Sequence, residues 1–292
     1  MHRLVCTPKR LLYQLLIPCW LLPGLAAAAG DLPRVMSTNL CADLLLVSMA
    51  APDQIVSLSR ASRDPSISPI ADLAAAYPAN DGGVEDLLYR QPDIALVYLG
   101  WSGGRFKELL AGQDIEILPV PYPTDWNDAL ATARTVAARI GRAEQGAAIA
   151  KDAERRLREL ARGVPPLRAL YLRPGGGSAG TGTYVDDVLH RLGLRNLAAE
   201  TGHTGWGAFP LEKILLHPPD VFLLGYFEQQ QALSASTYAR HPLLKDLLAR
   251  TPQVRVPSRL WGCGGLELVG AAEAIAEQLR ALDTGTLPWT RR

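Results

Sequence analysis

The glycine-rich segment 175–180, GGGSAG, matches two patterns that carry chemistry in other proteins. The first is G-x-G-x-x-G, which in dinucleotide-binding proteins opens directly into a helix and is followed about 20 positions later by an acidic residue. Here residues 181–183 intervene before any predicted helix, and Glu200 does not clearly end a strand. The spacing therefore does not favour a dinucleotide site.

The second pattern is G-x-S-x-G, in which Ser178 would be the nucleophile of a hydrolase. Such an enzyme needs an acidic residue and then a histidine further along the chain. Asp220 and His241 occur in that order, as they would in many unrelated sequences. One candidate function is therefore that of an exported serine hydrolase that uses Ser178. The preferred interpretation of the glycines is a flexible loop near a binding cleft, and the hydrolase is kept as the alternative.

The histidines are too scattered to predict a site for a free metal ion. His190, His203, His217 and His241 follow the N-terminal region, and none of them forms a short ligand-spaced pair. Zinc and similar ions need several His, Cys or carboxylate ligands close in space. A metal held by its own organic chelator needs no such ligands, so a chelate is the favoured metal-containing ligand, and no cofactor is expected.

Aromatic side chains and arginines lie just after several predicted strands, where α/β proteins bind their ligands. Aromatic rings offer a large flat contact surface, and arginines pair with anionic groups. The ligand-binding candidates are Asn39, Cys41, Arg60, Trp101, Tyr122, Arg173, Trp206, Tyr226, Trp261 and Cys263. We expect Trp101 and Trp261 at the mouth of the cleft, because each follows an apolar strand and adjoins glycines. For each aromatic residue, ordinary packing is the alternative.

Cys41 and Cys263 are the cysteines that remain once the N-terminal segment is removed. They could form one disulfide in an oxidising compartment, although only the fold could bring positions so far apart in sequence together. Two separate buried thiols are the alternative, and direct metal binding by both thiols is a third.

The elements that must position these residues alternate between strands and helices. Strands are predicted over 34–37, 54–59, 94–99 and 115–120. A helix over 40–49 begins after Asn39, a residue type favoured as an N-cap. Alternating strands and helices predict a parallel sheet that is covered on both faces.

Residues 126–160 are rich in Ala, Arg, Glu and Leu and predict a long helix, a turn and a second helix rather than one continuous helix. After Pro165 and Pro166 the alternation resumes. Its elements are predicted over 167–172, 184–192, 211–216 and 221–224, with a last helix over 266–282.

Residues 84–97 (VEDLLYRQPDIALV) and 211–224 (LEKILLHPPDVFLL) form an internal repeat. Both have Glu at the second position, aliphatic residues at the fourth and fifth, and then Pro-Asp before an apolar run. Each copy predicts a short helix, a proline stop and a buried strand. Because one copy precedes the helical segment and one follows it, the repeat predicts two similar lobes; chance similarity is the alternative.

The first 29 residues have the pattern of a secretory signal peptide. Three basic residues precede a mostly apolar stretch over 11–25, and alanines occupy 26–29. We expect cleavage after Ala29. A membrane anchor is the alternative, although the apolar stretch is short for a span and contains prolines; lipidation at Cys19 is another.

The formal net charge of the chain is +1, and no basic stripe occurs. A nucleic-acid partner is therefore not expected. No second long apolar run follows the N-terminal segment, so we expect a soluble mature protein in the periplasm.

The repeat, the opening segment 34–46 (RVMSTNLCADLLL) and the segment 182–198 (GTYVDDVLHRLGLRNLA) resemble the periplasmic binding proteins for iron-siderophores, haem and vitamin B12. The resemblance spans 34–282. It implies two α/β lobes joined by a rigid backbone helix, and one glutamate on each lobe that docks onto arginines of a membrane permease. Glu85 and Glu212 match those positions, and carboxylate–guanidinium pairs are strong and geometrically specific. A favourable charge at a helix N-terminus is the alternative role.

Together these features predict an α/β protein with two Rossmann-like lobes, each with a central sheet, joined by a long backbone helix around a ligand cleft. The expected divisions are a signal peptide over 1–29, an N-terminal lobe over 30–123, a connecting helical segment over 124–162 and a C-terminal lobe over 163–292. The expected function is that of a monomeric, non-enzymatic solute-binding component of an ABC importer. It would deliver a ferric siderophore or a cobalamin (corrinoid) to the permease.

Overall fold

The computed structural model describes residues 32–101, 106, 109–110, 112–228 and 236–282. The expected signal peptide and its cleavage position at Ala29 lie outside these described residues. Among the residues that the structure describes, no helix combines the length and apolar character needed to cross a bilayer.

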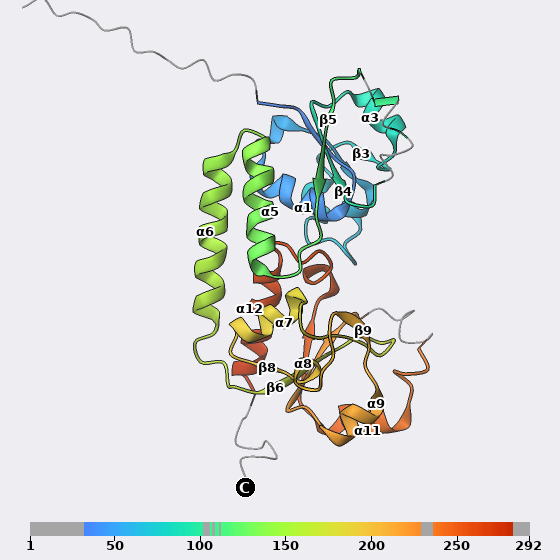
Figure 1. Ribbon diagram of the computed structural model, residues 1–292, viewed down its shortest axis with the longest axis vertical. Helices are drawn as coiled ribbons and strands as arrows, with labels where there is room; N and C mark the ends of the chain where they lie inside the picture. The colour runs from blue at the N-terminus through green and yellow to red at the C-terminus, as the bar shows by residue number, and fades with distance from the viewer. Residues whose placement is uncertain (1–31, 102–105, 107–108, 111, 229–235, 283–292) are drawn as a thin grey trace, which may run out of the picture. The chain divides into compact units, whose positions relative to one another are not determined.

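The first lobe is built on a sheet of five parallel strands in the order β3-β2-β1-β4-β5 (Figure 1). The strands are β1 (Val35–Ser37), β2 (Ile55–Ser59), β3 (Ala79–Asn80), β4 (Ile94–Tyr98) and β5 (Glu116–Val120). The helices of this lobe whose bounds are described are α1 (Leu40–Met49), η1 (Pro52–Gln54), η2 (Arg60–Arg63), α2 (Ala71–Ala74) and α3 (Val84–Arg90). Ile94 and Leu96 of β4 pack into the core on one face of the sheet, and Ala95 and Val97 pack into the core on the other. Coverage of both faces explains the continuous apolar run.

The second lobe repeats this plan with a parallel sheet in the order β11-β10-β6-β8 and a small antiparallel pair, β7 with β9. The strands are β6 (Arg168–Leu172), β7 (Gly177–Ala179), β8 (Arg195–Asn196), β9 (Trp206–Ala208), β10 (Val221–Gly225) and β11 (Gln253–Val256). Its helices among the described residues are α7 (Tyr184–Arg191), α8 (Leu197–Glu200), α9 (Leu211–Leu216), α11 (Pro242–Arg250), η3 (Ser258–Leu260) and α12 (Leu268–Arg280).

The two copies of the repeat form the same unit in each lobe, namely α3 with β4 and α9 with β10. The Pro-Asp step has a structural role that is identical in both. The Asp93 carboxylate accepts a hydrogen bond from the backbone N–H of Arg34 at 2.6 Å, and Asp220 accepts one from Arg168 at 2.7 Å. Each aspartate thereby fixes the start of the neighbouring central strand, β1 or β6.

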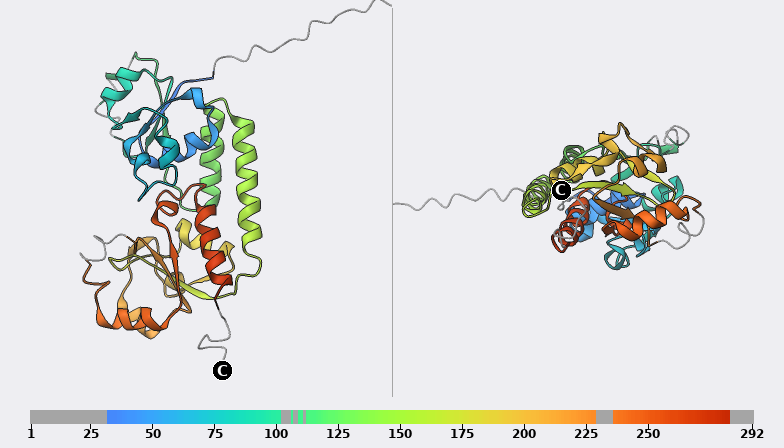
Figure 2. Two further views of the ribbon diagram at one scale, coloured as in Figure 1. Left: turned by 180° about the vertical axis from the view of Figure 1, so that it is seen from behind. Right: turned by 90° about the horizontal axis from the view of Figure 1, so that it is seen from below.

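The helical connection consists of two helices, α5 (Trp126–Arg139) and α6 (Ala143–Leu160), which lie side by side (Figures 1 and 2). Helix α6 packs against α1 of the first lobe and α12 of the second, so a long helix joins the lobes as expected, with α5 lying beside it. Gly141 at the turn has φ +74°, a conformation that glycine adopts readily. Gly146 allows the two helices to approach closely, because a Cβ placed there would lie 2.1 Å from the Cβ of Ala137.

Helix α5 belongs to the cores of both lobes. Trp126 and Leu130, near its start, pack into the core of the second lobe. Ala133 and Val136, one turn further on, pack into the core of the first. A change in the relative position of the lobes would therefore disturb packing on this helix.

Candidate functional site

A cavity of about 360 Å³ lies at the carboxyl ends of strands from both lobes. Its lining residues are Tyr122, Tyr171, Arg173, Tyr184, Trp206, Tyr226 and Gly262. Tyr122 follows β5 in the first lobe, whereas Arg173 and Tyr226 follow β6 and β10 in the second. The position is the one at which open α/β sheets bind ligands. We refer to this space as the tyrosine cavity.

The hydroxyl groups at one side of the tyrosine cavity bridge the two lobes. The hydroxyls of Tyr122 and Tyr184 are hydrogen-bonded to each other at 2.8 Å. Tyr184 donates its proton to the backbone carbonyl of Trp261 at 2.5 Å, so Tyr122 is the donor to Tyr184, and its single proton is shared between that hydroxyl and the backbone carbonyl of Gly262 at 3.0 Å. Both phenols are thus anchored to backbone, which leaves their rings as the surface offered to a ligand.

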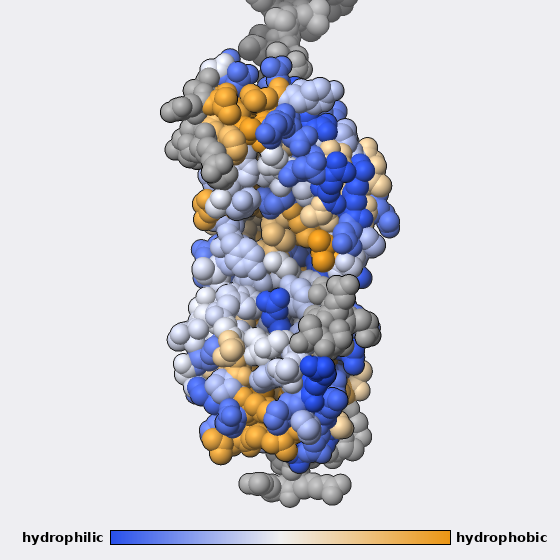
Figure 3. All heavy atoms as spheres, turned by 90° about the vertical axis from the view of Figure 1, so that its right-hand side faces the viewer, coloured by the Kyte–Doolittle hydropathy of each residue, from blue (hydrophilic) through white to orange (hydrophobic). Residues whose placement is uncertain are grey.

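The aromatic rings support one another through edge-to-face contacts. The Trp206 ring lies 5.2 Å from that of Tyr184 and 6.2 Å from that of Tyr171, between ring centroids. Trp261 packs behind them, 5.6 Å from Tyr171. Such tilted and T-shaped pairs are favoured geometries, so the cavity wall is preorganised. Figure 3 shows many pale residues of intermediate hydropathy, the class that includes Tyr and Trp, where the two lobes meet on this side.

Arg173 and Tyr226 form the polar end of the cavity. The guanidinium carbon of Arg173 lies 4.4 Å from the ring centroid of Tyr226, a cation–π contact. Tyr226 has φ +66°, an unusual conformation for a bulky side chain. Strained backbone of this kind persists where the surroundings enforce it and is frequent at ligand sites.

The tyrosines of the cavity are neutral near pH 7. Burial is the main reason that the pKa of Tyr122, Tyr171, Tyr184 and Tyr226 is raised above the ordinary phenol value. Arg173 is consequently the one charged side chain among the lining residues of this cavity. The cavity combines flat aromatic surface, neutral phenols and a single cation, which suits a ligand with both an apolar ring system and an anionic group.

One segment of the second lobe, residues 258–263, provides a series of contacts to the first lobe. Besides the Gly262 carbonyl, Cys263 is bonded to Cys41 in a disulfide. The Ser258 hydroxyl donates to the backbone carbonyl of Ser66 at 3.3 Å. The open question of the two cysteines is thus answered by a covalent link that joins the first turn of α1 to the edge of the tyrosine cavity.

Four of the candidate binding residues, Tyr122, Arg173, Trp206 and Tyr226, line the tyrosine cavity. Other candidates have different partners. The Asn39 side chain caps α1 by accepting from the N–H groups of Cys41 and Ala42. Arg60 is an exposed residue that pairs with Asp81.

The two tryptophans expected at the cleft mouth lie elsewhere. Trp261 is only 1% exposed, because its ring packs beneath the tyrosines, so adjacency to glycines did not indicate an open loop. Trp101 is half-buried in the first lobe, where its indole N–H donates to the carbonyl of Gly82 at 2.9 Å. Neither ring lines the tyrosine cavity.

Sequence reasoning missed Tyr171, Tyr184 and Gly262 as lining residues. Tyr171 lies inside an apolar strand, where its pattern predicts core packing. Tyr184 begins a helix, just after its N-cap Thr183, and its ring orientation depends on how that helix packs. An apolar strand that contains a tyrosine near its carboxyl end is the signal that could have found the first of them.

The residues of the alternative hydrolase are not assembled. Ser178 is buried and donates to the carbonyl of Tyr171 at 2.6 Å. Asp220 accepts from the backbone of Arg168, and His241 accepts from the backbone of Leu243. Within the described residues, His, Cys, Asp and Glu side chains also form no group of three or more that could hold a metal ion.

Two parallel-sheet lobes that meet at an aromatic cavity, with helices connecting them, define the class of two-lobed solute-binding proteins. Residues 35–252 match the family described as "Periplasmic binding protein". The chain belongs to this family. No curated protein matches the sequence.

Solved structures share the fold at low sequence identity. The periplasmic haem-binding protein HutB of Vibrio cholerae superposes with a TM-score of 0.68 at 18% identity, over 85% of this chain and 98% of that one. The vitamin B12-binding protein BtuF of the same organism gives 0.60 at 16% identity, over 86% and 97%. A possible iron-binding solute-binding protein from Staphylococcus epidermidis ATCC 12228 gives 0.66 at 15%, over 85% and 98%.

Proposed function

We propose that this protein is the periplasmic solute-binding component of an ABC importer for a metal chelate, which it delivers to the inner-membrane permease. The observation that carries the proposal is the tyrosine cavity, which lies where the carboxyl ends of two parallel sheets meet. Family membership supports transport as the role.

The chemistry of the cavity narrows the ligand class. Its rings suit a flat or macrocyclic chelator, and Arg173 suits a carboxylate or another anionic group on that chelator. Because the phenols are neutral and two are hydrogen-bonded to backbone carbonyls, they contribute ring surface rather than charge. A ferric siderophore and a corrinoid both fit this description, and haem joins them because haem-binding proteins share the fold.

The proposed permease contacts are Glu85 and Glu212. Both are exposed in the first turn of a short helix, at equivalent positions of the internal repeat. One turn later, Tyr89 and Leu216 are 85% and 74% exposed. Each lobe therefore presents a carboxylate beside an exposed apolar side chain, a combination that fits a permease surface with arginines among apolar residues.

The proposal is tested by titrating the purified protein, expressed without residues 1–29, with cobalamin, haem and a panel of ferric siderophores. Trp206 is 42% exposed at the cavity, so saturable quenching of tryptophan fluorescence is expected for one of them, after correction for ligand absorbance. Arg173→Gln should weaken that binding at least tenfold, as expected for a lost charge-assisted contact. Arg60→Gln removes an exposed arginine outside the cavity and should leave the affinity unchanged.

No saturable binding of any of these chelates would contradict the proposed ligand class. Equal affinities of the Arg173→Gln variant and the wild type would contradict the assignment of the cavity.

A further inference from the structure

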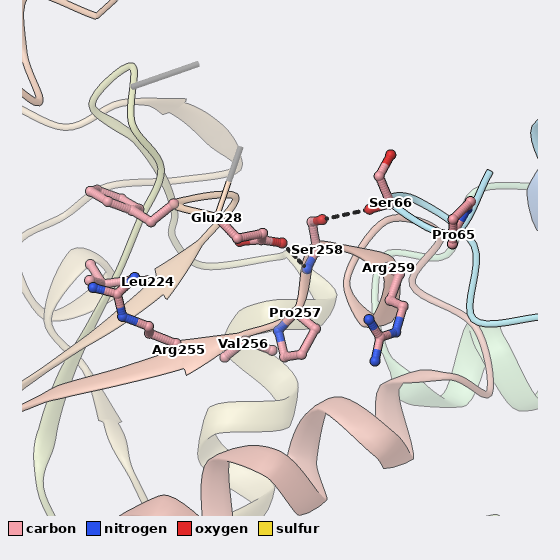
Figure 4. A pocket seen from close by; sticks show the side chains of 10 residues that line it. Pro65, Ser66, Leu224, Glu228, Arg255, Val256, Pro257, Ser258 and Arg259 are labelled. Atoms are coloured by element: carbon pink, nitrogen blue, oxygen red, sulfur yellow. Dashed lines mark hydrogen bonds between the residues drawn. The ribbon is translucent and has the colours of Figure 1, made fainter. Parts of the chain in front are cut away.

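A second cavity, of about 410 Å³, lies at the carboxyl ends of β10 and β11 and shares no lining residue with the tyrosine cavity. Figure 4 shows its side chains. Apolar side chains form much of its wall: Leu224, Phe227, Val256, Pro257 and Pro65. The last of these comes from the first lobe, so the cavity also lies where the lobes meet. Its size is within the range of small-molecule sites.

Two arginines, Arg255 and Arg259, line this second cavity, and both are exposed. Among the described residues, neither guanidinium has a hydrogen-bond or ion-pair partner within contact distance. Arg259 has only a longer-range electrostatic interaction with Glu228. The cations are therefore available to a bound anion.

The single carboxylate in the cavity, Glu228, is already occupied. It accepts a hydrogen bond from the backbone N–H of Ser258 at 2.7 Å (Figure 4). Burial raises the pKa of Glu228, but hydrogen bonds from Ser258 and the charge of Arg259 outweigh it, so the pKa is lowered and the group is anionic near pH 7. With two arginines against one carboxylate, the cavity is positively charged on balance.

We propose that the second cavity binds an amphipathic anion, namely a molecule with an apolar ring system and one carboxylate or sulfonate group. The ring system would lie against Phe227, Leu224 and Val256, and the anionic group would pair with Arg255 or Arg259. This proposal does not rest on the proposed transport function, because the second cavity and the tyrosine cavity have no lining residue in common.

The test uses two dyes that differ by one charged group. 8-Anilinonaphthalene-1-sulfonate carries a sulfonate, whereas N-phenyl-1-naphthylamine has the same ring system without it. Dye fluorescence measures each affinity. The wild type should bind the sulfonate dye more tightly, and Arg255→Gln/Arg259→Gln should weaken its binding at least tenfold while changing the neutral dye less than twofold. Arg60→Gln, which removes an exposed arginine outside both cavities, should leave both affinities unchanged.

Equal sulfonate-dye affinity in the double variant and the wild type would overturn the proposal, as would a loss that appears in Arg173→Gln instead. Glu228→Gln gives an independent reading if the double variant does not fold, as judged by circular dichroism. It removes the repelling charge but keeps an acceptor for Ser258, so affinity for the sulfonate dye should rise a few-fold. A fall or no change in that variant would count against the site.

Discussion

The hydroxyl of Tyr122 in the first lobe lies 2.8 Å from the hydroxyl of Tyr184 in the second. Together with the bond from Tyr122 to the Gly262 carbonyl, this contact ties the lobes to each other at the edge of the tyrosine cavity. Any opening of the lobes at this edge must break the hydrogen bond that the single Tyr122 proton shares between these two acceptors.

Tyr122→Phe should loosen this edge. A net contribution of about 1 kcal/mol for such hydrogen bonds corresponds to about a fivefold loss of affinity for the chelate that the titration identifies. Backbone amides of residues 258–264 should also exchange faster with deuterium. Tyr98→Phe is the matched control, because Tyr98 is also 51% exposed in the same lobe and does not line the cavity. Equal exchange in the two variants would contradict the bridging role.

Loss of the disulfide between Cys41 and Cys263 should destabilise the protein. The bond closes a loop with a sequence separation of 222, and removing a link across a long loop costs about 2–5 kcal/mol. Urea unfolding of Cys41→Ser/Cys263→Ser measures the loss. Treatment with a reductant should lower the stability of the wild type to that of the double variant and leave the variant unaffected. A wild type that is insensitive to reductant would show that the bond does not form.

Tyr226→Gly should weaken binding of the chelate while leaving the stability of the protein nearly unchanged. Relief of the left-handed backbone at φ +66° offsets the lost ring contacts, since that conformation costs a non-glycine residue roughly 1–2 kcal/mol. We expect a melting temperature close to that of the wild type, with chelate affinity reduced at least tenfold. Gln91→Gly relieves φ +45° at the end of α3 and should stabilise the protein without changing affinity. Unchanged affinity in Tyr226→Gly would remove Tyr226 from the site.

Gly146→Ala should force α5 and α6 apart. The new methyl group would lie 2.1 Å from the Cβ of Ala137, so one helix must shift. Overpacking of this kind costs about 1–3 kcal/mol, measured by thermal or urea unfolding. Gly175→Ala adds the same methyl group where no atom lies within 4 Å and should change stability little. Similar effects of the two substitutions would argue against close packing of the helices.

Asp43 should make the first lobe less stable as pH rises. Its carboxyl group is fully buried and accepts hydrogen bonds from the hydroxyls of Ser37, Ser59 and Ser62. Burial outweighs those bonds and raises the pKa of Asp43 above its ordinary value. The folded protein therefore holds this proton more tightly than the unfolded chain does, and the stability that it contributes is lost as pH rises through the folded pKa.

Asp43→Asn removes that titration. The difference in free energy of unfolding between wild type and variant should be most favourable to the wild type near pH 4 and decline toward neutral pH. Urea unfolding in matched buffers measures it at each pH. A difference that stays constant or grows with pH would contradict the raised pKa.

The sequence predicted β1, β2, β4, β5, β6 and β10, because a strand buried on both faces has a continuous apolar run, whereas β3, β7, β8, β9 and β11 were not predicted. Residues 94–99 were predicted as a buried strand, and β4 spans Ile94–Tyr98. The repeat located α3 and α9 because each helix must end at a proline, before the aspartate that fixes the start of the neighbouring central strand, β1 or β6. Asn39 was recognised as a cap because its side chain acts on the adjacent turn.

The lining of the tyrosine cavity was harder to predict. Whether a residue lines it depends on where its side chain points and on how segments far apart in the sequence pack together. Trp261 and Gly262 are neighbours in the sequence, yet the Trp261 ring is buried whereas Gly262 lines the tyrosine cavity. Tyr171 belongs to a strand whose pattern predicts core packing, and its ring nonetheless reaches the cavity wall. The two helices α5 and α6 were anticipated from composition, but their close approach depends on a single hydrogen atom at Gly146.

Helix α5 contributes Trp126 and Leu130 to one core and Ala133 and Val136 to the other. Neither lobe has a complete hydrophobic core without α5. If the two lobes were produced as separate chains, at least one of them would therefore expose apolar surface. We therefore expect the two sheets to unfold in one cooperative transition, because the fourteen residues of this helix belong to both cores.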